Sequence, residues 1–202
     1  MSTLPIDPMR TAVVVLAAGG GSRFEGLTHK LLVPVKGRPL VVWAVGAAVE
    51  AAIGSVVVVA GAVDLTDVLT DAGLVDQVTL VGNVAWRDGQ ATSLQVGISV
   101  ADRSDIDIDA VVVGLGDQPG IPAEAWGLVA RADPAADIVV ATYDGRRRNP
   151  VRLARRVWPD LPVTGDEGAR SLMARRSDRV SEIGCPGRPA DIDTMEDLAR
   201  WS

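Results

Sequence analysis

A glycine-rich loop followed by cationic side chains is the feature of this sequence that most directly predicts chemistry. The apolar run Val13–Leu16 leads into Ala17-Ala18-Gly19-Gly20-Gly21-Ser22-Arg23, and Lys30 follows shortly after. Glycines allow backbone N–H groups to approach phosphate oxygens, and cations can neutralise the charge of a triphosphate and of departing pyrophosphate. We therefore predict that this loop binds phosphates, with Arg23 and Lys30 supplying positive charge.

Two common phosphate-binding motifs do not fit this loop. The spacing from Gly21 to Gly26 matches a Walker loop, but Leu27-Thr28 stands where Lys-Ser/Thr is required. The dinucleotide fingerprint can begin at Gly19 and Gly21, but it meets Phe24 where a third glycine would allow close helix packing. An ordinary strand-to-helix turn is the alternative to a phosphate site.

Acidic residues beside predicted strands and helices are candidates for holding a metal ion. Asp117 closely follows the apolar run Val111–Leu115, and open α/β sheets bind ligands beyond the carboxyl ends of their strands. Asp191 and Asp193 lie two residues apart in an extended segment, so both are expected to point to one side. Mg²⁺ commonly uses one or two carboxylates together with substrate phosphates. Asx turns and helix capping are the structural alternatives.

Polar groups elsewhere can contact the rest of a nucleotide or an acceptor. Asn83 and Ser93 follow the third predicted strand and carry groups suited to a base or ribose edge, although a capped polar loop explains them too. The segment 165–170 combines glycines, acids and an arginine at a helix start, which suits an acceptor phosphate. The basic turn 143–150 can touch an anionic second substrate or be a solvated hairpin.

These residues need a framework, and the apolar pattern predicts an α/β fold. Short β-branched runs alternate with helical stretches, and the early runs are apolar throughout, as in parallel strands covered on both faces. The expected strands are Ala12–Ala17, Ser55–Ala60, Gln77–Val81, Ala110–Leu115 and Asp137–Ala141; the expected helices are Leu40–Ala52, Leu65–Ala72, Ala91–Val100, Ala123–Ala130, Gly168–Arg175 and Thr194–Trp201.

The predicted architecture is a single domain over residues 1–202, with three α/β/α layers, a mainly parallel sheet and a flexible start over residues 1–10. Capping by Thr194 is expected to begin the last helix, with Asp197 as its third-position acid. We expect Arg152, Arg155 and Arg156 to form a helical surface.

Composition limits the possible partners and metals. The net charge of −6 over 202 residues argues against general nucleic-acid binding. Cys185 is the only cysteine and His29 the only histidine, so any metal must rest on oxygen ligands. We expect Cys185 to be structural and His29 to be incidental. No run is long enough to cross a bilayer and the start lacks a secretory pattern, which favours the cytoplasm and no membrane partner.

Taken in order, several segments resemble the motifs of the molybdenum cofactor cytidylyltransferase-like nucleotidyltransferases, a MobA-like group of NTP transferases with a glycosyltransferase-A-like fold. The resemblance spans almost the whole chain. Two positions depart from it: the stretch between Arg23 and Lys30 is longer, with Phe24 in place of methionine, and Asn149 stands where many members carry histidine. The matching segments are 16–23, 30–32, 37–40, 83–97, 116–119, 149–151, 165–170 and 191–194.

The resemblance implies transfer of CMP from CTP to a molybdopterin-type molybdenum cofactor, with Mg²⁺ as cofactor and release of pyrophosphate. Ala17-Ala18 resembles the cytidylyl branch, and a molybdenum hydroxylase is the implied client. Arg23, Lys30 and Asp117 are the implied catalytic residues, with Asp117 and Asp193 as metal ligands and Asp191 in reserve. The expected nucleotide-binding residues are Leu16, Ala17, Ala18, Gly19, Gly20, Gly21, Ser22, Arg23, Lys30, Asn83, Ser93 and Asp117.

Two other functions are compatible with the same residues. One is a nucleotidyltransferase that uses GTP or acts on a sugar-phosphate or phospholactate acceptor. The other is a maturation protein that carries nucleotide or molybdenum cofactor without catalysis. Retention of Lys30, Asp117 and Asp193 favours an enzyme over a carrier.

Overall fold

The computed structural model describes residues 10–24, 28–103 and 107–201. Over these residues the chain forms a seven-stranded sheet and a separate hairpin of β2 (Pro34–Val35) and β3 (Arg38–Pro39). The order across the sheet is β5 (Thr79–Gly82), β4 (Val56–Ala60), β1 (Thr11–Ala17), β6 (Ala110–Leu115), β8 (Arg146–Ala154), β7 (Ile138–Tyr143) and β9 (Val180–Gly184).

The sheet is mainly parallel, and its central strands are buried on both faces. Every residue of β1 and β4 is buried, and β1 lies parallel to both β4 and β6. β8 breaks the pattern: it runs antiparallel to β6 and to β7, and β7 pairs in parallel with β9. The β-branched side chains of the central strands therefore need helices on both sides.

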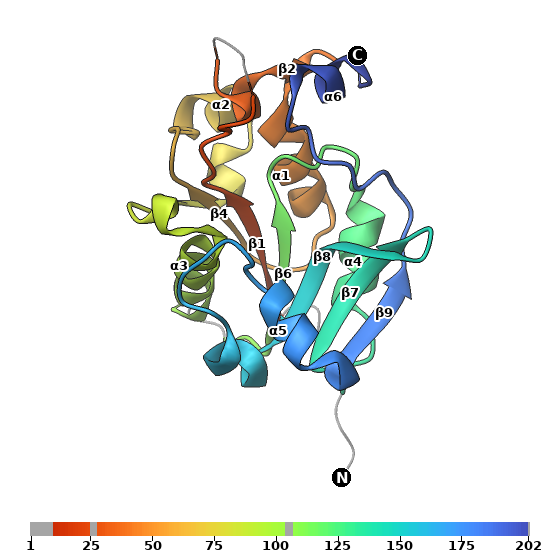
Figure 1. Ribbon diagram of the computed structural model, residues 1–202. Coiled ribbons are helices and arrows are strands. Elements are labelled where there is room, and N and C mark those ends of the chain that lie inside the picture. The colour runs from red at the N-terminus through yellow and green to blue at the C-terminus, as the bar shows by residue number, and fades with distance from the viewer. Residues whose placement is uncertain (1–9, 25–27, 104–106, 202) are drawn as a thin grey trace.

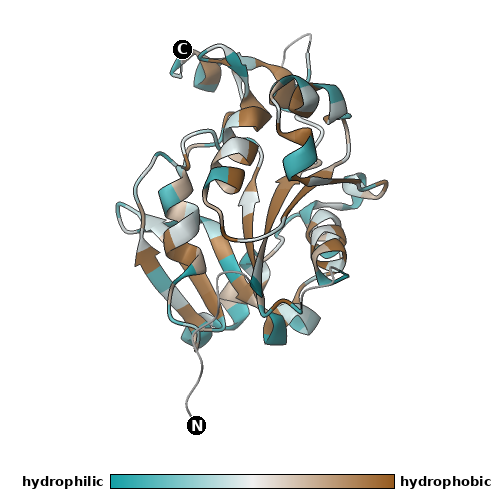
Figure 2. Cartoon of the chain, turned by 180° about the vertical axis from the view of Figure 1, so that it is seen from behind, coloured by the Kyte–Doolittle hydropathy of each residue, from teal (hydrophilic) through white to brown (hydrophobic). Residues whose placement is uncertain are grey.

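Helices cover both faces of this sheet (Figure 1). One face packs against α1 (Leu40–Glu50), α2 (Thr66–Asp71) and α4 (Ala123–Ala130), while the other packs against α3 (Gln90–Asp102) and α5 (Arg170–Arg175). Figure 2 shows apolar residues concentrated in the strands between these layers. The predicted three-layer α/β/α fold with a mainly parallel sheet is confirmed.

Several predicted boundaries shift by a few residues. Gln77 ends a 3-10 turn instead of opening a strand, and α5 starts at Arg170. The last helix, α6 (Met195–Ala199), has the predicted capping box between Thr194 and Asp197. Of the expected flexible start, residues 1–9 lie outside the described residues, and so does the acidic and glycine-containing insertion 25–27.

The expected helical surface of Arg152, Arg155 and Arg156 is wrong. Arg152 belongs to strand β8 and is 0% exposed, while Arg155 and Arg156 open a 3-10 turn, η5 (Arg155–Asp160). The Arg152 guanidinium donates to the carbonyls of Ala130 and Ala132, at 3.1 and 2.8 Å. Arg152 therefore satisfies the end of α4 instead of facing solvent.

Asp137 ties the β7–β9 side of the sheet together, and its loss is expected to destabilise the fold. Its carboxylate accepts hydrogen bonds from Arg156 and from Arg179, the latter at 2.9 Å, and its side chain is only 12% exposed. Burial disfavours its charge, but the two arginines outweigh burial and lower the pKa of Asp137. Asp137→Asn should cost about 2 kcal/mol of unfolding free energy at pH 7, measured by urea denaturation.

The lowered pKa also fixes the pH dependence of this contribution. A carboxyl group that ionises more readily in the fold stabilises it above its unfolded pKa, near 3.8, and this stability is lost as pH falls through the folded pKa. The gap between wild type and Asp137→Asn should therefore shrink below about pH 4. Asp160→Asn, at the exposed pair with Arg176, is the matched control and should change stability by under ~1 kcal/mol. An equal loss in both variants would contradict the assignment.

Within the described ranges, no helix has the length and apolar character needed to cross a membrane.

Candidate active site

The glycine loop and Asp117 meet because β1 and β6 are parallel neighbours that end together. Leu16 pairs in register with Leu115, and the Gly116 N–H donates to the Leu16 carbonyl at 2.9 Å. A Cβ on Gly116 would lie 2.9 Å from the Ala17 Cβ, so glycine allows the two strand ends to stay this close. Asp117 thus emerges beside the loop at the carboxyl edge of the sheet, as predicted.

The C-terminal acids return to this edge through backbone contacts. The Ile192 N–H donates to the Asp117 carbonyl at 3.2 Å, and the buried Gln118 amide donates to Asp191 Oδ1 at 2.7 Å. The Asp193 N–H donates to Asp197 Oδ2 at 3.2 Å, beside the capping box of α6. These contacts fix the direction of Asp193 relative to Asp117.

Lys30 joins the two acids. Its ammonium lies 2.7 Å from Asp117 Oδ2 and 2.8 Å from Asp193 Oδ1, and its side chain is 10% exposed. Burial would lower the pKa of Lys30, but the charges and hydrogen bonds of Asp117 and Asp193 outweigh it and raise this pKa. Lys30 is therefore a fully charged ammonium held at the centre of the site.

Arg23 reaches the same cluster from the solvent side. Its guanidinium lies 3.1 Å from Asp193 Oδ2, while its side chain is 77% exposed. Among the residues predicted to be catalytic, Lys30 and Asp117 are thus fixed by close contacts, and Arg23 is a peripheral cation. An exposed arginine is free to turn toward an anionic ligand with little change in packing.

The acids also suit a hard divalent cation. Asp117 Oδ1 is buried and accepts no hydrogen bond from any residue that the structure describes. An unpaired carboxylate oxygen beside a second carboxylate matches the way Mg²⁺ uses one or two carboxylates with substrate phosphates. Over the same described residues, no cluster of three or more His, Cys, Asp or Glu has a metal-binding arrangement, so substrate oxygens would have to complete the ligand set.

Asp191 lies apart from the lysine contacts. Partial burial raises the pKa of Asp191, and the charges of Asp117 and Asp193 raise it further, while the Gln118 hydrogen bond lowers it. The two acids at 191 and 193 therefore do not act alike: Asp193 binds Lys30, whereas Asp191 is held by Gln118.

The glycine loop is shaped by a turn and by a histidine that the sequence analysis expected to be incidental. Gly21 has a φ of +61°, and its carbonyl accepts the Phe24 N–H at 2.9 Å. His29 Nε2 lies 3.0 Å from the Gly19 carbonyl, and its Nδ1 accepts the Leu31 N–H at 3.3 Å. Burial lowers the pKa of His29, as does the nearby Lys30 charge. Neutral His29 thus links the glycine loop to the segment that contains Lys30. The position of His29 directly before Lys30 is the feature of the sequence that could have indicated this role.

Asn83 and Ser93 lie close together, but Asn83 is used internally. The Asn83 amide donates to the hydroxyls of Thr92 and Ser93, at 2.8 and 2.9 Å, and its oxygen accepts the Ala85 N–H. Both side chains are buried, with Asn83 4% and Ser93 3% exposed, and Ser93 also lines a cavity beside the glycine loop. Cys185 packs near α4, with Sγ 3.9 Å from the Ala125 carbonyl, and burial raises the pKa of its thiol.

Connected hollows surround these groups. A loop cavity of about 350 Å³ is lined by the glycine loop with Lys30, Asp117, Asp166 and Asp193. A second hollow of about 700 Å³ overlaps it and extends past Trp86 and Arg170. A third cavity has about 450 Å³, an apolar floor that includes Leu94 and Val113, and a rim with Arg147, Arg148 and Arg170.

A charged cluster beside a glycine loop, at the carboxyl edge of an α/β sheet and among hollows that share lining residues, is the usual arrangement of a ligand site in open α/β folds. The chain belongs to the family of the MobA-like NTP transferase domain, whose model matches residues 13–180. It is therefore a nucleotidyltransferase.

Known proteins of similar sequence have different names. The nicotine blue oxidoreductase of Paenarthrobacter nicotinovorans is 30% identical over 93% of this chain and 94% of its own length. The bifunctional protein GlmU of Roseobacter denitrificans is 30% identical over 74% of this chain, a match that spans 32% of GlmU.

Solved structures share the architecture. Rv0371c from Mycobacterium tuberculosis H37Rv has a TM-score of 0.78 at 25% identity, covering 96% of this chain and 97% of that one. A nucleotidyl transferase from Methanothermobacter thermautotroptrophicus has a TM-score of 0.75 at 21% identity and covers 95% of both chains, a likeness of fold alone. Another structure of Rv0371c is a complex with manganese, with a TM-score of 0.77 at 24% identity, covering 95% of this chain and 97% of that one.

Proposed function

We propose that this nucleotidyltransferase transfers CMP from CTP to a molybdopterin-type molybdenum cofactor and releases pyrophosphate. The observation that carries the proposal is the pair of salt bridges from Lys30 to Asp117 and Asp193 beside the glycine loop. The loop would hold base and triphosphate, Ser93 would contact the nucleoside, and Asn83 would support it from within its own segment. Ala17-Ala18 favours cytosine, as in the cytidylyl branch that the sequence resembles.

The chemistry needs no protein nucleophile. An oxygen of the acceptor phosphate attacks the α-phosphorus in line; a P–O bond forms as the bond to pyrophosphate breaks. Lys30 and Arg23 would stabilise the charge that develops on the phosphates, and the backbone N–H groups of the loop would orient them. Asp117 and Asp193 would hold Mg²⁺, which when bound neutralises charge on the triphosphate.

The third cavity, which in this proposal holds the acceptor, suits a molecule that is part flat and part anionic. Its apolar floor suits a fused ring, and Arg148 and Arg170 at the rim suit a phosphate. Asp191 lines both this cavity and the large hollow beside the loop, so the two spaces adjoin where transfer would occur. A molybdenum hydroxylase would be the client that receives the product.

Pyrophosphate release tests this proposal. The protein is incubated with Mg²⁺ and each of CTP, GTP, ATP and UTP, against molybdopterin-type cofactor and against sugar phosphates. We expect CTP with the molybdenum cofactor to give at least ~10-fold more pyrophosphate than any other pair, the discrimination expected from ~1.4 kcal/mol of differential transition-state binding. Preference for a sugar phosphate would support the second candidate, a nucleotidyltransferase with another acceptor.

Two further outcomes separate other functions. Binding of labelled CTP without pyrophosphate release for any acceptor would support a carrier. The name of the Paenarthrobacter relative also suggests a redox reaction for a protein of this kind, and consumption of NADH or NADPH with nicotine blue tests it. Redox turnover together with no nucleotide transfer would overturn the proposed function.

A further inference from the structure

The segment 83–93, between β5 and α3, is braced by its own hydrogen bonds. The Thr92 hydroxyl has one hydrogen to share between the carbonyls of Ala85 and Gly89, at 3.0 and 2.8 Å, and its oxygen accepts from the Asn83 amide at 2.8 Å. The Asp88 N–H donates to the Ala85 carbonyl at 2.9 Å. We call this segment the bracket, because this bonding makes it a stiff unit that can hold other loops in place.

One end of the bracket presses on the glycine loop through Trp86. A Cβ on Gly20 would lie 2.8 Å from Cζ3 and 3.0 Å from Cη2 of Trp86, so the indole edge lies directly against the Gly20 backbone. Gly61 allows the same approach at the base of the side chain, since its Cβ would lie 2.8 Å from the Trp86 Cβ. The Arg87 guanidinium covers the ring at 4.3 Å. Trp86 is thus contacted by the backbone at Gly20 and at Gly61 and by the Arg87 side chain.

The space at Gly20 differs from that at its neighbours. Gly19 has nothing within 4 Å of its Cβ position, and Gly21 requires glycine for its positive φ. Gly20 has no positive φ, and the close atoms at its Cβ position belong to Trp86. The need for glycine at this position of the phosphate loop therefore comes from the tryptophan.

The other end of the bracket holds the segment 165–170. The Gly165 N–H donates to the Asp88 carbonyl at 2.9 Å, and the Ala91 N–H donates to the Gly165 carbonyl at 2.9 Å. A Cβ on Gly89 would lie 2.3 Å from the Gly165 carbonyl carbon. Asp166 and Arg170 of this segment line the hollows of the site. The bracket therefore contacts both the glycine loop and the segment 165–170, which we call the acceptor-side segment.

We propose that Trp86 is a positioning residue that sets the glycine loop at a fixed distance from the acceptor-side segment. The consequence for catalysis rests on the proposed function, since in-line transfer requires the two substrates to be held in register, and a misplacement of about 1 Å can cost ~100-fold in rate. The mechanical part does not rest on it: Trp86 limits opening of the glycine loop in the protein without ligand.

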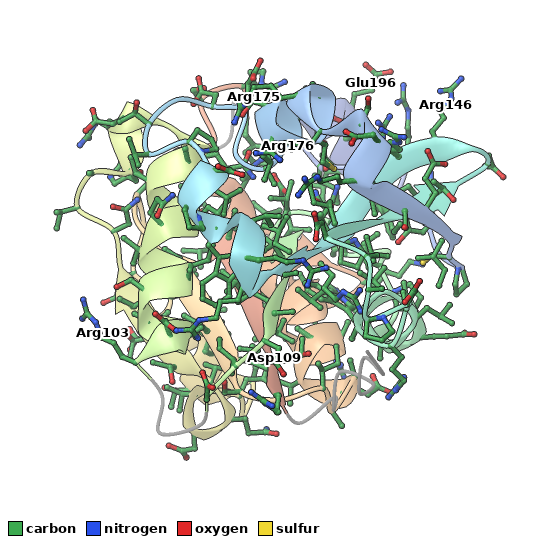
Figure 3. The ribbon with its side chains drawn as sticks, turned by 90° about the horizontal axis from the view of Figure 1, so that it is seen from below. Arg103, Asp109, Arg146, Arg175, Arg176 and Glu196 are labelled. Carbon is green, nitrogen blue, oxygen red and sulfur yellow. The ribbon has the colours of Figure 1, made fainter. Side chains whose placement is uncertain are left out.

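Trypsin tests the mechanical part without any substrate. Cleavage after Arg23 requires the glycine loop to open, because Phe24 is buried, whereas Arg146 is exposed and points outward (Figure 3) and provides an internal reference. We expect Trp86→Ala to speed cleavage after Arg23 at least ~10-fold relative to Arg146, and Trp86→Phe to restore most of the protection. Equal ratios in wild type and Trp86→Ala would overturn the proposal.

A double-mutant cycle tests the contact itself. Gly20→Ala should lower kcat about 10- to 100-fold because the new methyl meets the indole, while Gly82→Ala, with nothing within 4 Å, should leave kcat unchanged. In Gly20→Ala with Trp86→Leu the loss should be no greater than in Trp86→Leu alone. Multiplying losses would overturn the contact. If wild type transfers no nucleotide, the proposed function fails, and the trypsin ratios still decide the role of Trp86.

Discussion

Asp117→Asn is expected to lower kcat by about 1,000-fold, because it removes the charge from the carboxylate that contacts Lys30 and that, in the proposed function, would hold the metal. The substitution keeps the size of the side chain. Lys30 retains Asp193 as a partner at 2.8 Å, so the fold should persist. The loss should appear in kcat more than in the KM for CTP, since the glycine loop, which we propose binds the nucleotide, is unchanged. Steady-state pyrophosphate release with circular dichroism on the same samples measures both effects.

The control for Asp117→Asn is Asp109→Asn. Asp109 pairs with Arg10 at 3.0 Å and lies on the side of the molecule viewed in Figure 3, away from the glycine loop. Like Asp117, Asp109 is a carboxylate paired with a cation, but it lines none of the three hollows. We expect near-native turnover from it. A near-native rate in Asp117→Asn would refute the active-site assignment.

The central strands could be predicted because burial on both faces leaves a continuous apolar run. β1, β4 and β6 are such runs, and their positions were read within a residue or two. β8 and β9 carry no such signal. β8 passes from the exposed Arg146–Arg148 into a buried half that contains Arg152, whose charge is satisfied by backbone carbonyls. β9 is an edge strand whose Glu182 pairs with Arg147 across the surface.

The individual residues of the candidate site could be predicted from the sequence, but the contacts between them could not. Asp117 and Asp193 were each recognisable, from the end of a strand and from a helix start. Several contacts bring them together, among them the backbone hydrogen bond from Ile192 to the Asp117 carbonyl and the shared contact with Lys30, and none of these has a trace in composition or periodicity. The hydrogen bond of His29 to the Gly19 carbonyl is a similar case, because the position of His29 beside Lys30 is a signal but its main-chain partner is not. A main-chain partner cannot be identified from residue types, and such partners help to assemble this site.

Lys30→Met is expected to have opposite effects on the two ligands of the site. Lys30 lies between Asp117 and Asp193, so without nucleotide its positive charge offsets the negative charge that would attract a cation to these carboxylates. Removal should strengthen Mn²⁺ binding to the ligand-free protein by about 10-fold, the effect of ~1.4 kcal/mol. The same change should weaken CTP binding, because the triphosphate loses a buried cation. Isothermal titration with Mn²⁺ alone and with CTP alone measures the two affinities.

The thermal stability of Lys30→Met gives a second, independent reading. Two carboxylates left without their shared cation repel each other, and loss of one partner from a buried pair costs about 3 kcal/mol. Mn²⁺ should restore part of that loss in Lys30→Met and have little effect on the wild type, since a ligand stabilises the state that binds it. Lys36→Met is the matched control, because the chain's other lysine lies in the exposed turn between β2 and β3. If Lys30→Met binds Mn²⁺ no better than the wild type, Lys30 does not limit cation binding at Asp117 and Asp193. That result would contradict the proposal that these carboxylates hold the metal.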